Sequence, residues 1–281
     1  MAKLVDALAL GASAARHEGS SPFLGTKTQR KYSRLNIFIL VIDMLKILFE
    51  NSDFIILNKP SGLVVHPFDF STEETLLNFL QEKSPQIFDI KNGKRLQDGR
   101  VINLAGIVHK LDRETSGIMV VAKNEATHKS LSEQFRNHQV KKVYRAYVVG
   151  KVEPQNFVID APLGRDKKSY RQSTNTDNKR GEMLPAVTNV KVLNVNEKIS
   201  YVELIPKTGR THQLRAHLSS INHPIIADKV YGDKNGETFG FERLALHAYS
   251  LSFVLNNETF SFTSELPKDF FRNRKLIMCP Q

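Results

Sequence analysis

The sequence predicts an α+β fold in which a central mixed, largely antiparallel sheet is flanked by helices and loops. From residue 45 onwards, short apolar runs typical of strands recur along the chain. Several of these runs are joined by turns too short for a crossover connection, so the strands they join should be antiparallel. Strands and helices also do not alternate in a strict βαβ repeat, which disfavours a doubly wound parallel sheet.

The first predicted elements are two strands and a helix. "KILFE" at 46–50 and "FIILNKP" at 54–60 are apolar runs on either side of the turn "NSD". In "EETLLNFLQEK", Leu76, Leu77 and Leu80 have helical spacing. We therefore expect a strand pair followed by a helix.

The middle of the chain predicts a buried strand, an amphipathic helix and a second strand. "GIMVVAK" at 117–123 is continuously apolar, and "NEATHKSLSEQFRNH" at 124–138 places Leu131 and Phe135 at i and i+4. "KKVYRAYVVG" at 141–150 alternates, and the residues expected on one of its faces are Tyr144, Ala146 and Val148.

The last predicted elements are a hairpin and a helix. "VTNVKVL" and "ISYVELI" flank the polar turn "NVNEK", which is typical of a β-hairpin. In "TGRTHQLRAHLSS" a turn leads into a helix that we expect to be capped near Thr211. Its apolar stripe would be Leu214, Leu218 and Ile221.

Composition and charge narrow the class of protein. A chain of 281 residues with 41% hydrophobic residues can bury a core, and its net charge of +11 favours a polyanionic partner such as RNA, DNA or an anionic membrane surface. Cys279 is the single cysteine, which excludes an intrachain disulfide and a cysteine-based zinc site and fits a reducing cytoplasm. The apolar run 37–42 is far shorter than the ~20 residues of a membrane-spanning helix, so neither export nor membrane insertion is predicted.

Residues 1–44 differ from the rest of the chain. They are weakly periodic, rich in Gly, Ser and Pro, and end in the basic stretch "TKTQRKYSR", as expected for a non-globular basic extension. An alternative is a start codon assigned too early, with Met44 the true N-terminus, because "LVDALALGASAARHEGSSP" resembles a translated leucine tRNA gene. Residues 273–281 are interpreted as a C-terminal tail.

Asp112 is the first candidate for chemistry. It lies in the polar, turn-like "HKLDRETSG" between Lys110 and Arg113, at the start of the predicted strand. Neighbouring cations favour the ionised form of a carboxylate, which then serves as nucleophile, general base or metal ligand. The alternative is an ordinary turn-capping aspartate.

The segment "KTGRTHQLRAHL" is the second candidate. On a helix, His212 and Arg215 stand three residues apart on one face, which would present a guanidinium beside an imidazole. The alternative is a solvated basic face. His212 and His217 are five residues apart and do not share a helical face, so no metal site is predicted.

Two further segments suit a nucleic-acid backbone. Tyr144 follows Lys141 and Lys142, so its ring could stack on a base beside a pair of phosphate-attracting cations. A core-facing tyrosine is the alternative. The segment 164–181 is rich in Lys and Arg and reads either as a flexible loop or hairpin that grips a backbone, or as a solvated surface.

Taken together, these segments resemble the RluA-type family of pseudouridine synthases. The motifs occur in the family's order and cover roughly residues 46–271; they are "LNKPSGLVVHP" (57–67), "GIVHKLDRETSGIMVVAK" (106–123), "KKVYRAYVVG" (141–150), "KTGRTHQLRAHL" (207–218), "HPIIADKVYG" (223–232) and "LALHAYSLSF" (244–253). The resemblance implies a pseudouridine synthase catalytic fold over residues 45–272. It also implies an isomerase that detaches uracil from C1′ in RNA, rotates it and rejoins it through C5, with no cofactor and no metal.

The resemblance assigns roles to individual residues. Asp112 matches the family's catalytic aspartate, Arg215 the arginine that pairs with it, and Tyr144 the tyrosine that stacks on the target base. The expected RNA contacts are His109, Lys110, Arg113, Lys141, Lys142, Arg165, Arg210 and His212.

This chain departs from the family pattern in two places. Lys110 stands where the family usually has an arginine, and it keeps the charge but loses the planar fork that fills the space of a flipped nucleotide. Residues 1–44 are too short to be the small RNA-binding domain that precedes the catalytic domain in many relatives, so target selection would come from the catalytic domain.

The expected substrate is large-subunit ribosomal RNA, and the expected enzyme is a cytoplasmic monomer. The alternatives are a tRNA pseudouridine synthase of the same family and a non-catalytic RNA-binding or ribosome-assembly factor. A carboxylate-based glycosidase would need a second acidic residue beside Asp112, and only Glu114 is near it in the sequence.

Overall fold

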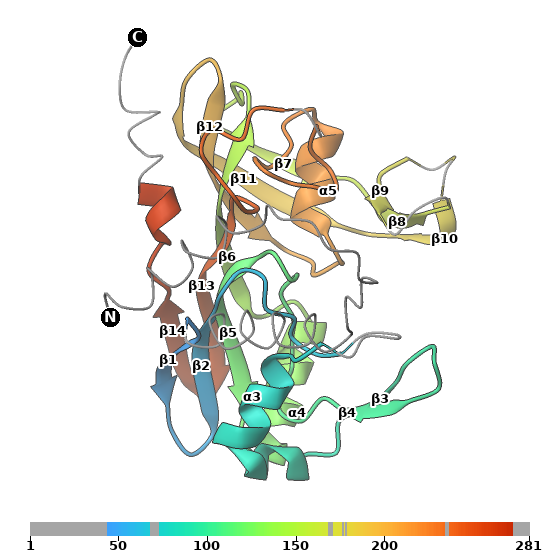
Figure 1. The fold of residues 1–281 in the computed structure, drawn as a ribbon, viewed down its shortest axis with the longest axis vertical. Helices are drawn as coiled ribbons and strands as arrows, with labels where there is room; N and C mark the ends of the chain where they lie inside the picture. Colours follow the sequence, from blue (N-terminus) through green and yellow to red (C-terminus); the bar gives the residue numbers. More distant parts are fainter. Residues whose placement is uncertain are drawn as a thin grey trace, which may run out of the picture. The chain divides into compact units, whose positions relative to one another are not determined.

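A mixed β-sheet organises the protein (Figure 1). The computed structural model describes residues 44–67, 73–167, 171–175, 177, 179–233 and 236–271. Within these residues nine strands form the sheet, in the order β1 (Lys46–Glu50), β2 (Phe54–Lys59), β5 (Ser116–Ala122), β13 (Leu246–Leu255), β6 (Lys141–Val149), β12 (Ile199–Pro206), β11 (Val187–Val195) and β7 (Asn156–Asp160), with β14 (Glu258–Thr263) paired to β13. The predicted α+β class with a largely antiparallel sheet is confirmed.

Strand β13 comes late in the sequence but lies in the middle of the sheet. It pairs in parallel with β5 and antiparallel with β6, and the β5 pairing is the one parallel contact within this sheet as described. The two strands approach closely at Gly117, where φ is +122° and a Cβ atom would lie 2.2 Å from the carbonyl oxygen of Ala248. Glycine is required there because a side chain would push β5 and β13 apart.

The local elements follow the sequence patterns. The predicted strand pair at the start is β1 and β2, and the predicted hairpin is β11 and β12. The helices α3 (Leu76–Lys83) and α4 (Glu125–Arg136) lie on one side of the β1–β2–β5 part of the sheet, with the 3-10 turn η2 (Pro85–Asp89) after α3 (Figure 1). Asn124 caps α4 by accepting a hydrogen bond from the Thr127 amide at 2.9 Å.

Two smaller sheets project from this framework. One is the pair β3 (Gly93–Arg95) and β4 (Val101–Asn103). The other consists of β8 (Leu163–Asp166), β9 (Gln172–Ser173) and β10 (Lys179–Leu184), which we call the basic sheet (Figure 1). The basic segment 164–181 therefore contributes strands, as the hairpin interpretation predicted.

Two hydrophobic clusters make up most of the core. One packs β2, β5, α3 and the C-terminal half of β13 together, and the other packs β6, β11, β12 and α5 (Gln213–Ser220). Tyr144 on β6 is half-buried and contacts both clusters. The ring therefore lies at the junction of the two cores.

Two sequence-based expectations need correction. The N-cap of α5 is His212 with φ +55°, not Thr211, and its side chain does not cap the helix. The alternative of a solvated basic face on α5 is wrong as well, because Gln213 to Leu218 are all buried in a helix that packs against the large sheet and against β9 of the basic sheet. In β6, Ala146 and Val148 are buried on the predicted face. Tyr147 on the opposite face is buried as well, so both faces of this part of the strand are covered.

Other expectations concern residues outside the described part. The basic extension lies there apart from Met44, which is exposed, and so does the tail at 273–281. Within the described residues, no helix is long and apolar enough to span a membrane.

Candidate active site

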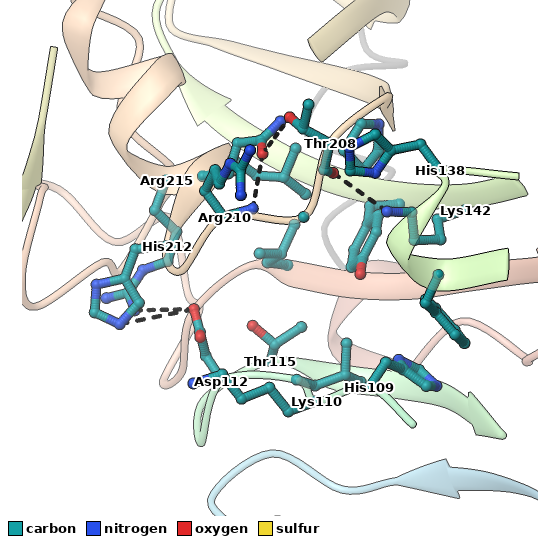
Figure 2. A pocket seen from close by; sticks show the side chains of 18 of the residues that line it. His109, Lys110, Asp112, Thr115, His138, Lys142, Thr208, Arg210, His212 and Arg215 are labelled. Atoms are coloured by element: carbon teal, nitrogen blue, oxygen red, sulfur yellow. Dashed lines mark hydrogen bonds and ion pairs between the residues drawn. The ribbon is translucent and has the colours of Figure 1, made fainter. Parts of the chain in front are cut away.

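A cavity of about 470 Å³ opens between two walls that are distant in sequence (Figure 2). The segment 108–115 forms one wall, and the segment 206–215 forms the other. Strand β6 adds Lys142 and Tyr144, and the end of α4 adds Phe135 and Arg136. The space has about the size of a small-ligand site, which is enough for a nucleotide base and its sugar.

Backbone hydrogen bonds fix the wall that carries Asp112. The carbonyl oxygen of Arg113 accepts from the Gly62 amide at 2.8 Å and from Lys59 Nζ at 3.0 Å. The carbonyl oxygen of Glu114 accepts from Ser61 Oγ at 2.7 Å. The turn after β2 therefore holds the turn before β5 in place.

Lys59 is the central anchor of this wall. Its side chain is fully buried, and Nζ donates to three carbonyl oxygens, those of Pro60, Leu63 and Arg113, at 2.8 to 3.0 Å. Burial lowers the pKa of Lys59 to about 7. Three acceptors match the three N–H groups of an ammonium, so no donor of Lys59 is left unpaired.

The carboxylate of Asp112 itself has few close partners. Its Oδ2 lies 3.4 Å from Arg215 Nη1 and 3.9 Å from His212 Nε2 (Figure 2). Its side chain keeps 21% of its exposure and faces the cavity. The wall therefore holds the backbone of Asp112 and leaves the carboxylate accessible to a ligand.

Arg215 is held mainly by Asp228. Its Nε and Nη2 each donate to Asp228 at 2.7 Å, which leaves Nη1 to face Asp112. The Asp228 side chain has no exposed surface, and Oδ1 also accepts from the amides of Val230 and Tyr231. Burial alone would raise the pKa of Asp228, but the Arg215 bonds and the two amides lower it below its usual value.

His212 occupies the left-handed region, where φ is +55° and a non-glycine residue is uncommon. Its Nε2 is the atom that faces Asp112, and Nδ1 lies 3.1 Å from Tyr231 Oη. Burial lowers the pKa of His212, although Asp112 opposes this shift. The ring is therefore neutral at physiological pH.

The loop before α5 is fixed by Gln213. Its side-chain oxygen accepts from Thr208 Oγ1 at 2.7 Å and from the Arg210 amide at 3.0 Å (Figure 2). Its Nε2 donates to Val187 O and Thr188 Oγ1 on β11. This buried amide thus holds the loop that presents Arg210 and His212.

Tyr144 and Lys142 point into the cavity from the same face of β6. Burial raises the pKa of Tyr144, and Asp112 adds to the shift, so the phenol keeps its proton. Lys142 Nζ donates to Thr208 O at 3.2 Å, and burial lowers the pKa of this amine. A protonated phenol and an amine therefore lie side by side on the strand.

The cavity brings together eight of the eleven residues selected from sequence. Those that line it are His109, Lys110, Asp112, Lys142, Tyr144, Arg210, His212 and Arg215. The other three, Arg113, Lys141 and Arg165, are exposed and do not line it. Lys141 and Lys142 cannot act as a pair in the cavity, because successive side chains of a strand point to opposite faces.

His109 has a structural contact that its sequence context did not suggest. Its ring stacks on Phe135 with centroids 4.5 Å apart, and Nε2 accepts a hydrogen bond from the Val120 amide at 3.1 Å. Burial and nearby Lys142 lower the pKa of His109 to about 3. This histidine is neutral and offers a ring to the cavity, not a charge.

Four functional candidates were missed from sequence. Arg136 and His138 line the cavity at the end of α4, while Asp228 and Tyr231 lie behind Arg215 and His212. Asp228 and Tyr231 belong to the motif "HPIIADKVYG", but nothing in their local spacing indicates a partner on α5. Among the residues described, no group of three or more His, Cys, Asp or Glu could hold a metal ion.

Comparisons with known proteins identify the family of this chain. The sequence profile of the family described as RNA pseudouridylate synthase matches residues 53–220. "Ribosomal large subunit pseudouridine synthase D" of Neisseria meningitidis serogroup B is 40% identical over 81% of this chain and 59% of its own length. The protein of the same name from Zymomonas mobilis is 36% identical over 83% of this chain and 73% of its own length. The chain thus spans about three fifths of the length of the Neisseria relative.

Two solved human structures have the same fold. RNA pseudouridylate synthase domain containing 1 is 27% identical with a TM-score of 0.63, covering 79% of this chain and 84% of its own. RNA pseudouridylate synthase domain containing 4 is 25% identical with a TM-score of 0.65, covering 88% and 97%. The chain belongs to the RNA pseudouridylate synthase family.

Proposed function

We propose that this protein is an RNA pseudouridine synthase that isomerises a specific uridine of large-subunit ribosomal RNA. The observation that carries the proposal is the accessible carboxylate of Asp112, which faces Arg215 and shares one cavity with Tyr144 in a chain of this family. The names of the Neisseria and Zymomonas relatives support the choice of ribosomal RNA.

Asp112 is the proposed catalytic carboxylate. The reaction breaks the bond between ribose C1′ and N1 of uracil and forms a bond from C1′ to C5. C5 loses its proton and N1 gains one, so that the product is an isomer of the substrate. Attack of Asp112 on C1′, its attack on C6 of the base, and its assistance to a glycal route all use an ionised carboxylate. Arg215 Nη1, 3.4 Å away, is placed to orient this carboxylate.

Tyr144 is the proposed platform for the base. Its ring lies at the junction of the two cores and faces the cavity, so a uracil inserted from the open side meets an aromatic face. The raised pKa keeps the phenol protonated, which makes it a donor to the rotating base.

Cationic side chains around the cavity would compensate for extrusion of the target uridine. Unstacking a nucleotide costs a few kcal/mol, which contacts to the phosphates must offset. Lys110, Lys142, Arg136 and Arg210 line the cavity and are the side chains that could supply these contacts.

Replacing Asp112 by Asn tests the assignment. The change keeps the shape and removes the nucleophile, so we expect no pseudouridine in unmodified large-subunit ribosomal RNA, while RNA affinity stays within about threefold. Asp53→Asn, in a turn where Asp53 bonds Asn124, is the control and should remain active. Activity of Asp112→Asn would overturn the role of Asp112.

Mapping pseudouridines in total RNA with and without the gene tests the substrate. We expect a site to disappear from large-subunit ribosomal RNA. Disappearance of a tRNA site instead would favour the tRNA alternative, and no disappearance at all would favour a non-catalytic RNA-binding factor.

We further propose that residues 45–272 form the catalytic domain and that the protein acts as a cytoplasmic monomer. The residues that line the cavity all come from this range of a single chain, which supports a site formed by one chain. Light scattering of the purified full chain tests the oligomeric state, since a dimer would have twice the mass of 31.9 kDa. Limited proteolysis tests the domain bounds, and cell fractionation tests the location.

A further inference from the structure

Tyr231 stands between the basic sheet and the wall that faces Asp112. Its Oη accepts a hydrogen bond from the backbone amide of Gln172 on β9 at 2.7 Å, and the same oxygen lies 3.1 Å from His212 Nδ1. One phenol therefore contacts both a strand of the basic sheet and the residue whose other ring nitrogen faces Asp112.

The direction of these hydrogen bonds follows from the donors. The Gln172 amide can only donate, so it occupies a lone pair of the phenol oxygen and leaves the O–H free to donate to Nδ1 of His212. A neutral imidazole that accepts at Nδ1 carries its proton on Nε2. That N–H points towards the Asp112 carboxylate, 3.9 Å away, and the lowered pKa of His212 agrees with a neutral ring.

The ring of Tyr231 also supports the arginine that faces Asp112. The guanidinium carbon of Arg215 lies 5.2 Å from the ring centroid, and that of Arg171, next to Gln172, lies 6.0 Å from it. The backbone amide of Tyr231 donates to Asp228, the main partner of Arg215. A shift of Tyr231 would therefore disturb both groups that face Asp112.

The basic sheet is suited to hold a polyanion. Arg165 and Lys167 are exposed on β8 and just after it, and neither lines the cavity. In the sheet register, Arg165 on β8 pairs with Gln172 on β9. A phosphate bound at Arg165 would thus restrain β9, the strand whose Gln172 amide donates a hydrogen bond to Tyr231.

We propose that Tyr231 is a positioning residue that couples binding of the RNA backbone on the basic sheet to the placement of His212 and Arg215 against Asp112. The inference rests on the proposed function. Binding of phosphates at Arg165 and Lys167 fixes β9, the Gln172 amide fixes Tyr231, and Tyr231 sets the tautomer and position of His212. The catalytic rate then responds to a contact made outside the cavity.

The first test is Tyr231→Phe, which keeps the ring beneath Arg215 and removes the hydroxyl. In single-turnover assays of tritium release from unmodified large-subunit ribosomal RNA labelled at uracil C5, we expect the maximal rate to fall roughly five- to tenfold. The enzyme concentration giving half the maximal rate should change less than twofold. Tyr147→Phe is the matched control, because Tyr147 Oη donates to Phe270 O at 3.0 Å in the core; it should lower the melting temperature and leave the rate unchanged.

The second test asks whether the basic sheet acts through Tyr231. In the wild-type background, Arg165→Gln combined with Lys167→Gln should lower the maximal rate and raise the half-saturating enzyme concentration. In the Tyr231→Phe background, the same pair should raise the half-saturating concentration alone. Equal rate losses in both backgrounds would overturn the coupling, and a merely structural role of Tyr231 does not produce this difference.

A third variant removes the contact between Tyr231 and His212 from the side of His212. His212→Asn keeps a polar group near Tyr231 and removes the Nε2 edge, and asparagine tolerates the left-handed backbone of position 212. It should also abolish the effect of the basic-sheet variants on the rate, even if Tyr231→Phe folds poorly. If the wild type releases no tritium, the proposed function fails; if it does and all variants keep wild-type coupling, only this inference fails.

Discussion

The two walls of the cavity are stabilised in opposite ways. The wall of Asp112 is held through its backbone carbonyls, by Lys59, Gly62 and Ser61, while the Asp112 side chain meets its partners only at 3.4 and 3.9 Å. The wall of Arg215 is held through side chains, with Asp228 satisfied by four donors within 3.0 Å. The group proposed to react is therefore left free, and the group proposed to orient it is immobilised.

The largest effect should come from removing the charge of Asp228, which holds the wall of Arg215 in place. Asp228→Asn leaves the buried Arg215 without its main counter-charge, and we expect the free energy of unfolding to fall by about 3 kcal/mol and the catalytic rate by roughly 100-fold. Urea denaturation and tritium release measure the two effects. Glu203→Gln, which breaks the half-buried pair with Arg145 across β6 and β12, is the control and should cost less than about 1 kcal/mol. Equal losses in both variants would contradict the special position of Asp228.

Removing the hydrogen bonds that hold the wall of Asp112 should lower the stability of the protein more than its catalytic rate. Lys59→Met removes the donors to three carbonyl oxygens, so we expect a loss of about 2 to 3 kcal/mol in the free energy of unfolding. The rate of the folded fraction should fall less than in Asp228→Asn, since no side chain in the cavity changes. Lys123→Met, at a more exposed amine that bonds Glu50 and Asn51, is the comparison and should cost under about 1 kcal/mol.

Between pH 6 and pH 3, acid should weaken the wall of Arg215 through Asp228, because Lys59, with a pKa of about 7, is already protonated over this range. The pKa of Asp228 is lowered on folding, so its contribution is fully present above the unfolded value of about 3.9 and is lost as the pH falls through the lower folded value. The stability difference between wild type and Asp228→Asn should therefore shrink when urea denaturation is repeated from pH 6 down to pH 3. A difference that stays constant over this range would show that Asp228 is not paired as described.

The smallest effect should be a difference between Lys142 and Lys141 in the salt dependence of RNA binding. Lys142→Gln should reduce the slope of log affinity against log salt by about one, because one cation in the cavity is lost. Lys141→Gln should leave the slope unchanged, since this side chain is exposed and lies on the other face of β6. Filter binding to unmodified ribosomal RNA at several salt concentrations measures both slopes.

Sequence patterns predicted most of the framework because the strands and helices have clear periodicity. The pairs β1–β2 and β11–β12, the buried strand β5 and helix α4 all lie where hydrophobic spacing placed them. The central position of β13 could not be predicted in this way, since its partners β5 and β6 are more than 90 residues away in sequence. Long-range pairing leaves no local signal.

The candidate site was predictable in its residues but not in its contacts. The family motifs selected Asp112, Tyr144 and Arg215, and the structure brings all three to one cavity. The pairing of Arg215 with Asp228 was missed, because a buried carboxylate after a short loop looks like any turn residue. The sequence could have predicted that Lys141 and Lys142 point to opposite faces of β6, since strand alternation alone implies it.

The central place of β13 has a consequence during protein synthesis. A nascent chain that ends before residue 246 lacks the strand that joins β5 to β6, and thus the strand that sets the Asp112 wall beside the Tyr144 strand. Because chains emerge from the ribosome N-terminus first, the two walls of the cavity can be brought together only after β13 has been synthesised. Chains that end before β13 should therefore lack the cavity, even though they already contain Asp112, Tyr144 and Arg215.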